Sequence, residues 1–219
     1  MKLLVLDTET TGITDTDKVV ELAWIEVDED LQVLDRVQSL IDPEMQIPPG
    51  ASGVHGITDR HVVNAPTLPE FFEFIAPQTD EPILMIAHNA AFDVKFVKGH
   101  MPVTDVLCTM RLAKHLYPNS PDFRLQTLRY VFGVESDAIA HGAAGDCDVC
   151  LLVLRAMLED SKLSLTEATE LAKRPIRYTT MQFGKHKGEA LADVPSGYKR
   201  WLFNQPDVDP DLIWSFNNL

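Results

Sequence analysis

The first part of the chain alternates between apolar runs and short polar turns. Residues 2–7 (KLLVLD) form an apolar run that ends in an aspartate, which is typical of a buried strand. Residues 19–27 (VVELAWIEV) and 32–41 (QVLDRVQSLI) are rich in Val, Ile and Leu and alternate in part, so we expect a meander of strands beside the first. Residues 82–87 (PILMIA) predict another buried strand, and 103–107 predict a short one.

Helical spacing dominates what lies between and after these runs. The clearest helix is 143–159, where apolar residues recur three and four positions apart. Further helices are expected at 67–76, from about 89 to 100, and at 108–116, 125–132 and 164–172. The segment 43–58 is rich in Pro and Gly and is expected to be a loop. This order of elements predicts an α/β layer fold with a mixed central sheet flanked by helices.

A change in charge divides the chain near Lys173. Residues 1–172 carry 12 basic and 28 acidic side chains, whereas residues 173–219 carry 7 basic and 5 acidic ones. We therefore expect a main domain over 1–172 and a small basic and aromatic appendage over 173–219. About 40 residues are too few for a robust independent core, so the appendage is expected to pack against the body. Its paired glycines around Lys-His-Lys predict a hairpin.

The bulk composition narrows the class of protein. No run of about 18 apolar residues occurs, so we expect no membrane span, and the short N-terminal run lacks the features of a signal peptide. A cytoplasmic location follows as an expectation. The net charge of −14 is unusual for a nucleic-acid enzyme, because phosphates attract Lys and Arg. Divalent cations held between carboxylates and phosphate would allow an acidic protein to bind nucleic acid.

Three cysteines are too few for a disulfide framework in a chain of this size. Cys147 and Cys150 form a C-x-x-C pair that could be a zinc or redox motif. A zinc site needs two further ligands, and no second pair is evident. The favoured interpretation is that both are small apolar residues of a helix.

Acidic residues stand where the predicted strands and helices begin or end. Asp7 and Glu9 in DTETTG are two apart in a strand, so both point to one face while Thr8 is turned away. Two such carboxylates repel one another unless a cation lies between them, and oxygen ligands suit Mg²⁺ or Mn²⁺. A solvated strand end entering a turn is the alternative.

Asp93 in HNAAFD would lie in the first turn of a helix, where an acid can simply favour the helix dipole. Asn89 is a plausible N-cap of that helix. His141 and Asp146 lie in HGAAGD, with small residues between them that leave the backbone open to a substrate. A single histidine is more often structural than catalytic, but His141 precedes a flexible loop and an acid on a helix.

These motifs in this order resemble the DEDDh exonuclease family, the relatives of the proofreading subunit of bacterial DNA polymerase III, which have an RNase H-like fold. DTETTG, HNAAFD and H-x-A-x-x-D are each weak signals, but together they are specific, and VHGIT (54–58) falls between the first two as in the family. The resemblance covers about residues 1–172. TMRLA (109–113) and the tail segments FGKHKG and GYKRWLF are similar to a compact member of the family.

The resemblance implies a 3′→5′ exonuclease that releases nucleoside 5′-monophosphates. Asp7, Glu9 and Asp146 would hold one divalent cation, Asp7 would bridge to a second, and Asp93 would help to place that second ion. Two Mg²⁺ or Mn²⁺ ions per site are implied, with His141 taking the proton of the attacking water. Backbone groups of Thr8 and Thr10 would meet the terminal nucleotide. His55 and Asn89 are further candidate contacts, although Asn89 is favoured as a cap.

The tail combines cations with aromatic rings, which suits nucleic acid. We expect Lys185 and Lys187 to contact the substrate, together with Tyr198, Lys199, Arg200 and Trp201. The alternative is that Trp201 and Phe203 only dock the tail to the core.

DNA is the preferred substrate, and two other functions stay open. One is an RNA-trimming enzyme of the same family. The other is a proofreading subunit that works through a protein partner, although the folded character of the tail indicates that no partner is required. Nothing in the sequence indicates the oligomeric state.

Overall fold

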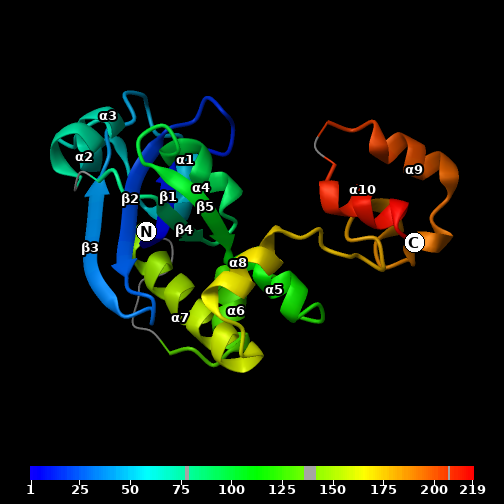
Figure 1. Ribbon diagram of the computed structural model, residues 1–219. Coiled ribbons are helices and arrows are strands. Elements are labelled where there is room, and N and C mark those ends of the chain that lie inside the picture. Colours follow the sequence, from blue (N-terminus) through cyan, green and yellow to red (C-terminus); the bar gives the residue numbers. More distant parts are fainter. Residues whose placement is uncertain (77–78, 136–141, 207) are drawn as a thin grey trace. The chain divides into compact units, whose positions relative to one another are not determined.

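A five-stranded mixed sheet forms the centre of the first 172 residues (Figure 1). The computed structural model describes residues 1–76, 79–135, 142–206 and 208–219. The strand order is β3-β2-β1-β4-β5; β2 runs antiparallel to its neighbours β1 and β3, whereas β1, β4 and β5 run parallel. The strands are β1 (Lys2–Thr10), β2 (Val19–Val27), β3 (Val33–Leu40), β4 (Ile83–Ala87) and β5 (Val103–Cys108).

Helices cover both faces of this sheet. Those after β5 are α5 (Thr109–Leu116), α6 (Leu125–Val131), α7 (Ala143–Ser161) and α8 (Leu165–Lys173), and α7 packs on β1 and β2 (Figure 1). Those before β5 are α1 (Pro49–His55), α2 (Asp59–Val62), α3 (Leu68–Glu70), the π-helical turn η1 (Phe71–Ile75) and α4 (Ala91–Val97). The expected mixed sheet flanked by helices is thus confirmed.

Strand β1 divides the core into two layers because its side chains alternate. Leu3 and Val5 are buried in the cluster that α7 covers. Leu4 and Leu6 are buried in the cluster that includes Phe71 and residues of α4. An apolar strand with both faces covered therefore ends in the polar residues of DTETTG, which places them at the edge of the core.

Two expected segments differ in the structure. The expected loop 43–58 contains helix α1, which begins at Pro49, a residue tolerated in a first helical turn, and is followed by Gly56 with φ +75°. The expected helix 67–76 starts as α3 with a Thr67–Glu70 capping box but continues as η1. The π turn begins at Phe71, whose ring packs edge-on against Trp24 with a centroid distance of 5.8 Å.

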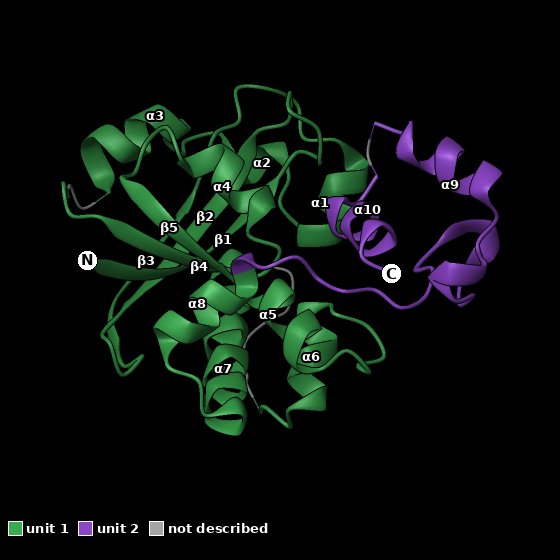
Figure 2. Ribbon diagram, turned by 45° about the vertical axis from the view of Figure 1, so that its right-hand side comes forward, with its two compact units in different colours: residues 1–172 green, residues 173–219 purple. Residues whose placement is uncertain are grey.

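The chain forms two compact units, Met1–Ala172 and Lys173–Leu219 (Figure 2). The second unit contains η2 (Gly184–His186), η3 (Leu191–Asp193), α9 (Ser196–Phe203) and α10 (Pro210–Asn217). It has a hydrophobic core of its own, formed by residues Met181, Leu191, Val194, Leu202, Leu212 and Phe216.

The chain reverses direction between Thr180 and Ala190, which form an antiparallel bridge. The expected hairpin is present only as this bridge and the turn η2, without paired strands among the described residues. In the part of the chain that the structure describes, no helix is long and apolar enough to cross a membrane.

Candidate active site

Three carboxylates meet where β1 ends and α7 begins. Asp7 and Glu9 lie two residues apart on β1, and Asp146 lies in the first turn of α7. Their ligand atoms all lie within 4.8 Å of one another, and each residue is only partly buried. Oxygen donors in this arrangement suit a hard divalent cation. The structure therefore brings together three of the four residues expected to bind metal.

In the absence of a cation, ionisation of Asp7 and Glu9 is unfavourable, and their pKa values are raised. Burial raises the pKa of Asp7 well above its ordinary value, and the nearby charges of Asp93 and Asp146 raise it further. Burial, with Asp146 next in effect, raises the pKa of Glu9 to about 7. A cation between these groups would remove both penalties, because it would favour the charged form of each carboxylate.

Asp93 lies on the other side of β1, in the first turn of α4. It is buried, and its Oδ1 accepts hydrogen bonds from the Thr8 backbone N–H at 3.0 Å and from the Thr8 Oγ1 at 2.7 Å. Burial raises the pKa of Asp93 to about 7 despite these bonds. Asp93 is outside the group of three, and the Thr8 side chain points away from Asp7 and Glu9, as the alternation of the strand requires.

Glu21 is a fourth acid at this centre, and the sequence analysis did not identify it. It lies on β2 directly opposite Glu9 and is 7% exposed. Its Oε2 accepts a hydrogen bond from the Ala143 backbone N–H at 2.9 Å, and its Oε1 accepts one from Gln38 Nε2 at 2.7 Å. Glu21 therefore ties β2 to the N-terminus of α7, the helix that carries Asp146. The sequence signal that could have identified Glu21 is an acidic residue in the interior of an otherwise apolar strand.

A cavity of about 750 Å³ adjoins the carboxylates. Gln126 of α6 donates a hydrogen bond from Nε2 to Asp146 Oδ1 at 2.8 Å, so the cavity and the group of three carboxylates share Asp146. The wall combines polar and apolar side chains, namely His88, Asn89, Met110, Phe123, Arg124, Leu125, Gln126, Thr127 and Asp146.

The expectation that Asn89 is the N-cap of α4 was wrong. Residue Ala90 occupies the N-cap position, and Asn89 has φ +60° in the preceding turn. Asparagine tolerates this left-handed conformation better than most residues. Its place in the cavity wall leaves it as a candidate substrate contact.

The other candidate contacts of the first unit lie close to β1. Burial lowers the pKa of His55, and the nearby Thr10 backbone and the charge of Glu21 offset part of this effect. His55 Nδ1 accepts a hydrogen bond from the Ile57 backbone N–H at 3.0 Å. The Thr10 hydroxyl donates to the Gly12 carbonyl at 2.6 Å, so it is engaged in the turn after β1. His141 lies outside the described residues.

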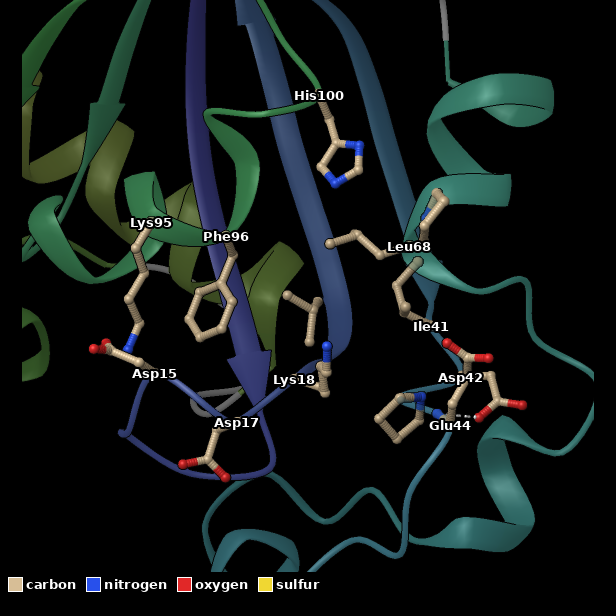
Figure 3. A pocket seen from close by; sticks show the side chains of 13 residues that line it. Asp15, Asp17, Lys18, Ile41, Asp42, Glu44, Leu68, Lys95, Phe96 and His100 are labelled. Carbon is tan, nitrogen blue, oxygen red and sulfur yellow. Dashed lines mark hydrogen bonds between the residues drawn. The ribbon is translucent and has the colours of Figure 1, made fainter.

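A second cavity of about 490 Å³ lies by the loop that follows β1 (Figure 3). Asp42 and Glu44 line one side of it, and Lys95 and Phe96 of α4 line the other (Figure 3). The Lys95 Nζ donates to the Ile13 carbonyl at 3.1 Å, so this cation helps to hold the loop. None of the three clustered carboxylates lines this cavity.

The C-x-x-C pair belongs to the core. Cys147 and Cys150 are buried free cysteines, and the Cys147 thiol donates to the Ala23 carbonyl at 3.4 Å. Burial raises the pKa of both thiols, which disfavours the thiolate that zinc binding or redox exchange needs. The interpretation as small apolar helix residues is supported.

Comparison with known proteins identifies the class. Residues 4–154 match the model of the exonuclease family RNase_T, and the chain belongs to this family. It is 31% identical over 217 residues to exodeoxyribonuclease 10 of Escherichia coli K12, which covers 96% of this chain and 94% of that protein. The match includes the tail, so the expected similarity to a compact family member is confirmed.

Two further similarities bear on the fold and the family. The epsilon subunit of DNA polymerase III from Treponema pallidum is 32% identical over 166 residues, covering 69% of this chain and 74% of the subunit. The structure of exonuclease X in complex with 5′ overhanging duplex DNA superposes with a TM-score of 0.65 at 24% identity, covering 78% of this chain and 99% of that one. The mixed sheet flanked by helices is therefore the RNase H-like fold of the DEDDh exonucleases.

Proposed function

We propose that this exonuclease removes nucleotides from the 3′ ends of DNA and releases nucleoside 5′-monophosphates. The observation that carries the proposal is the group of three carboxylates within 4.8 Å, in a chain of an exonuclease family. The names of two relatives, an exodeoxyribonuclease and a DNA polymerase subunit, support DNA over RNA. The purified chain is expected to act without a protein partner.

The three clustered carboxylates fit a divalent cation, and we propose two Mg²⁺ or Mn²⁺ ions per site. The donors are carboxylate oxygens, and the raised pKa values of Asp7 and Glu9 reflect burial and repulsion by neighbouring acids that a cation would relieve. Asp7, Glu9 and Asp146 would hold one ion, Asp7 would also reach the second, and Asp93 would help to place it. When bound, such a pair of ions supplies charge neutralisation and lowers the pKa of water at the scissile phosphate.

The protein side chains supply orientation and proton transfer. Gln126 and Glu21 position Asp146, the first through its side chain and the second through the start of α7. His141 is proposed to accept the proton of the attacking water, since an ordinary histidine pKa near 6.5 suits a base at neutral pH. Thr8 and Thr10 backbone groups, His55 and Asn89 are proposed to hold the terminal nucleotide.

The decisive experiment compares Asp146→Asn with Asp148→Asn on 3′-labelled and 5′-labelled single-stranded DNA in Mg²⁺. Asp148 is a matched control, because it lies on the same helix but bonds to Arg36 Nη2 at 2.7 Å. We expect the wild type and Asp148→Asn to release the 3′ label as a mononucleotide and to shorten the 5′-labelled strand progressively. Asp146→Asn is expected to be inactive.

Release of the 5′ label first, or full activity of Asp146→Asn, would overturn the proposal. Parallel digestion of an RNA strand of the same sequence tests the exoribonuclease alternative. That alternative replaces the DNA assignment if RNA is digested faster.

A further inference from the structure

The segment FGKHKG (183–188) of the second unit packs against Tyr198 in the first turn of α9. His186 is 7% exposed, and its ring lies edge-on against Tyr198 with a centroid distance of 4.5 Å. Gly184 has φ +73°, and a Cβ there would lie 2.6 Å from the Tyr198 Oη. Glycine is therefore required by both conformation and space. The glycine and the histidine of this motif hold the turn in place.

Several other side chains of the same turn and helix are exposed. Trp201 is 53% exposed and Phe183 is 43% exposed, and the Trp201 ring lies 5.2 Å from the ring of Tyr198. Lys185, Lys187 and Arg200 are exposed as well. We call this set the cationic–aromatic surface: Phe183, Lys185, Lys187, Arg200 and Trp201.

In the part of the chain that the structure describes, the cations of this surface have no acidic partner. The nearby acid Glu189 is bonded to His186 Nδ1 at 2.8 Å. Among the described residues, neither Lys185 nor Lys187 forms an ion pair. By contrast, Phe203 on the same helix packs on Phe216 at 5.6 Å, which explains its presence as core packing. Exposed aromatic rings beside free cations indicate a binding surface rather than a core.

We propose that the cationic–aromatic surface binds single-stranded nucleic acid outside the catalytic centre. Lysine and arginine neutralise phosphates, and exposed aromatic faces accept stacked bases of any sequence. The first unit carries a net charge of −16 and repels a polyanion, whereas the second carries +2. Because the two units are covalently linked, a strand held by one is concentrated near the other. The inference rests on the proposed function only in its choice of nucleic acid as the partner.

The test is binding of a fluorescent oligo(dT) to the full chain in EDTA, where no digestion is expected. Lys185→Gln/Lys187→Gln removes two cations and is expected to lower the slope of log affinity against log salt by about 1.4. Trp201→Ala is expected to weaken binding at least about 5-fold, as loss of one stacked base predicts. Trp201→Phe keeps an aromatic face and is expected to retain most of the affinity.

Matched controls remove the same groups elsewhere. Lys98→Gln/Lys162→Gln removes two exposed lysines of the first unit, and Trp214→Ala removes an indole of α10 that is 36% exposed. Both are expected to bind like the wild type. Oligo(dT) is also expected to quench the tryptophan fluorescence of the wild type but to quench that of Trp201→Ala less.

The inference is overturned if the Lys185/Lys187 variant keeps the affinity and salt slope of the wild type, whatever Trp201→Ala does. An acidic protein partner would then be the better occupant. Failure of the proposed function is distinguishable, because digestion is measured separately in Mg²⁺. A chain that binds through this surface yet leaves 3′ ends intact contradicts only the proposed activity.

Discussion

Neutralising Glu9 should stabilise the metal-free protein while destroying its activity. The pKa of Glu9 is raised from 4.5 to about 7, first by burial and then by Asp146, Glu21 and Asp93. Between these two pH values the folded state binds more protons than the unfolded state, so stability falls as pH rises through this window. Above about pH 7 the full penalty is present, and below about pH 4.5 it is absent.

The size of the effect follows from the shift. A rise of about 2.5 pKa units corresponds to about 3 kcal/mol. Glu9 is partly exposed, and solvent screening reduces this to about 1–2 kcal/mol. Glu9→Gln has the same shape without the charge, so it should be more stable than the wild type by that amount at pH 8.5 and nearly equal at pH 5. Asp93, with its pKa raised to about 7, should leave a residual pH dependence in the variant.

Urea unfolding in EDTA measures the difference in stability between Glu9→Gln and the wild type, with the fluorescence of Trp24 as the signal. Replacing Trp201 and Trp214 with Phe in all samples leaves Trp24, in the core of the first unit, as the reporter. The exposed acid Glu29 provides the control, since Glu29→Gln should change stability by less than about 0.5 kcal/mol.

Saturating Mg²⁺ should then reverse the order of stability. A ligand at 100 times its Kd adds about 2.7 kcal/mol to the wild type, whereas a variant without one metal ligand gains less. The reasoning is refuted if Glu9→Gln is less stable than the wild type at pH 8.5 in EDTA, or if Mg²⁺ stabilises both equally.

Three further predictions concern residues that support the site or the two cores. Glu21→Leu removes the acceptor of the Ala143 N–H, so it should raise the Mg²⁺ concentration needed for half-maximal activity, because the start of α7 loses its tie to β2; an unchanged Mg²⁺ titration would contradict a positioning role. Leu154→Ala empties a fully buried position and should lower the free energy of unfolding by about 2–5 kcal/mol in urea, and a loss under 1 kcal/mol would show that the core relaxes around the cavity. Gly184→Ala places a Cβ 2.6 Å from the Tyr198 Oη at φ +73°, so proteolysis of the second unit should accelerate by about 5-fold or more while that of the first is unchanged; equal resistance in both variants would show that the turn adapts.

The sequence predicted the elements whose pattern is local and strong. Strand β1 and helix α7 carry long apolar patterns, and the acids that end or enter them were recognised as Asp7, Glu9 and Asp146. Their meeting within 4.8 Å follows from the order of motifs rather than from any single spacing.

Residues that act through pairing across the fold could not be predicted in the same way. Glu21 matters because the β1–β2 register sets it opposite Glu9 and because the start of α7 lies beside it, although 122 positions separate it from Ala143. Gln126 matters through one hydrogen bond to Asp146, which no pattern in α6 indicates. Likewise, the π turn that begins at Phe71 coincides with a tertiary contact between the Phe71 and Trp24 rings, which no local pattern indicates.

The placement of charge explains how an acidic chain can act on a polyanion. Glu21, Asp93 and the three clustered carboxylates concentrate negative charge at one end of the sheet, where it would favour divalent cations and disfavour phosphate. An enzyme built this way cannot gain substrate affinity by adding lysines beside its metal-binding carboxylates, because those lysines would compete with the cations. A separate basic unit, tethered to the first, would supply phosphate attraction without that competition. The charge break near Lys173 is what the chemistry of the proposed centre leads us to expect.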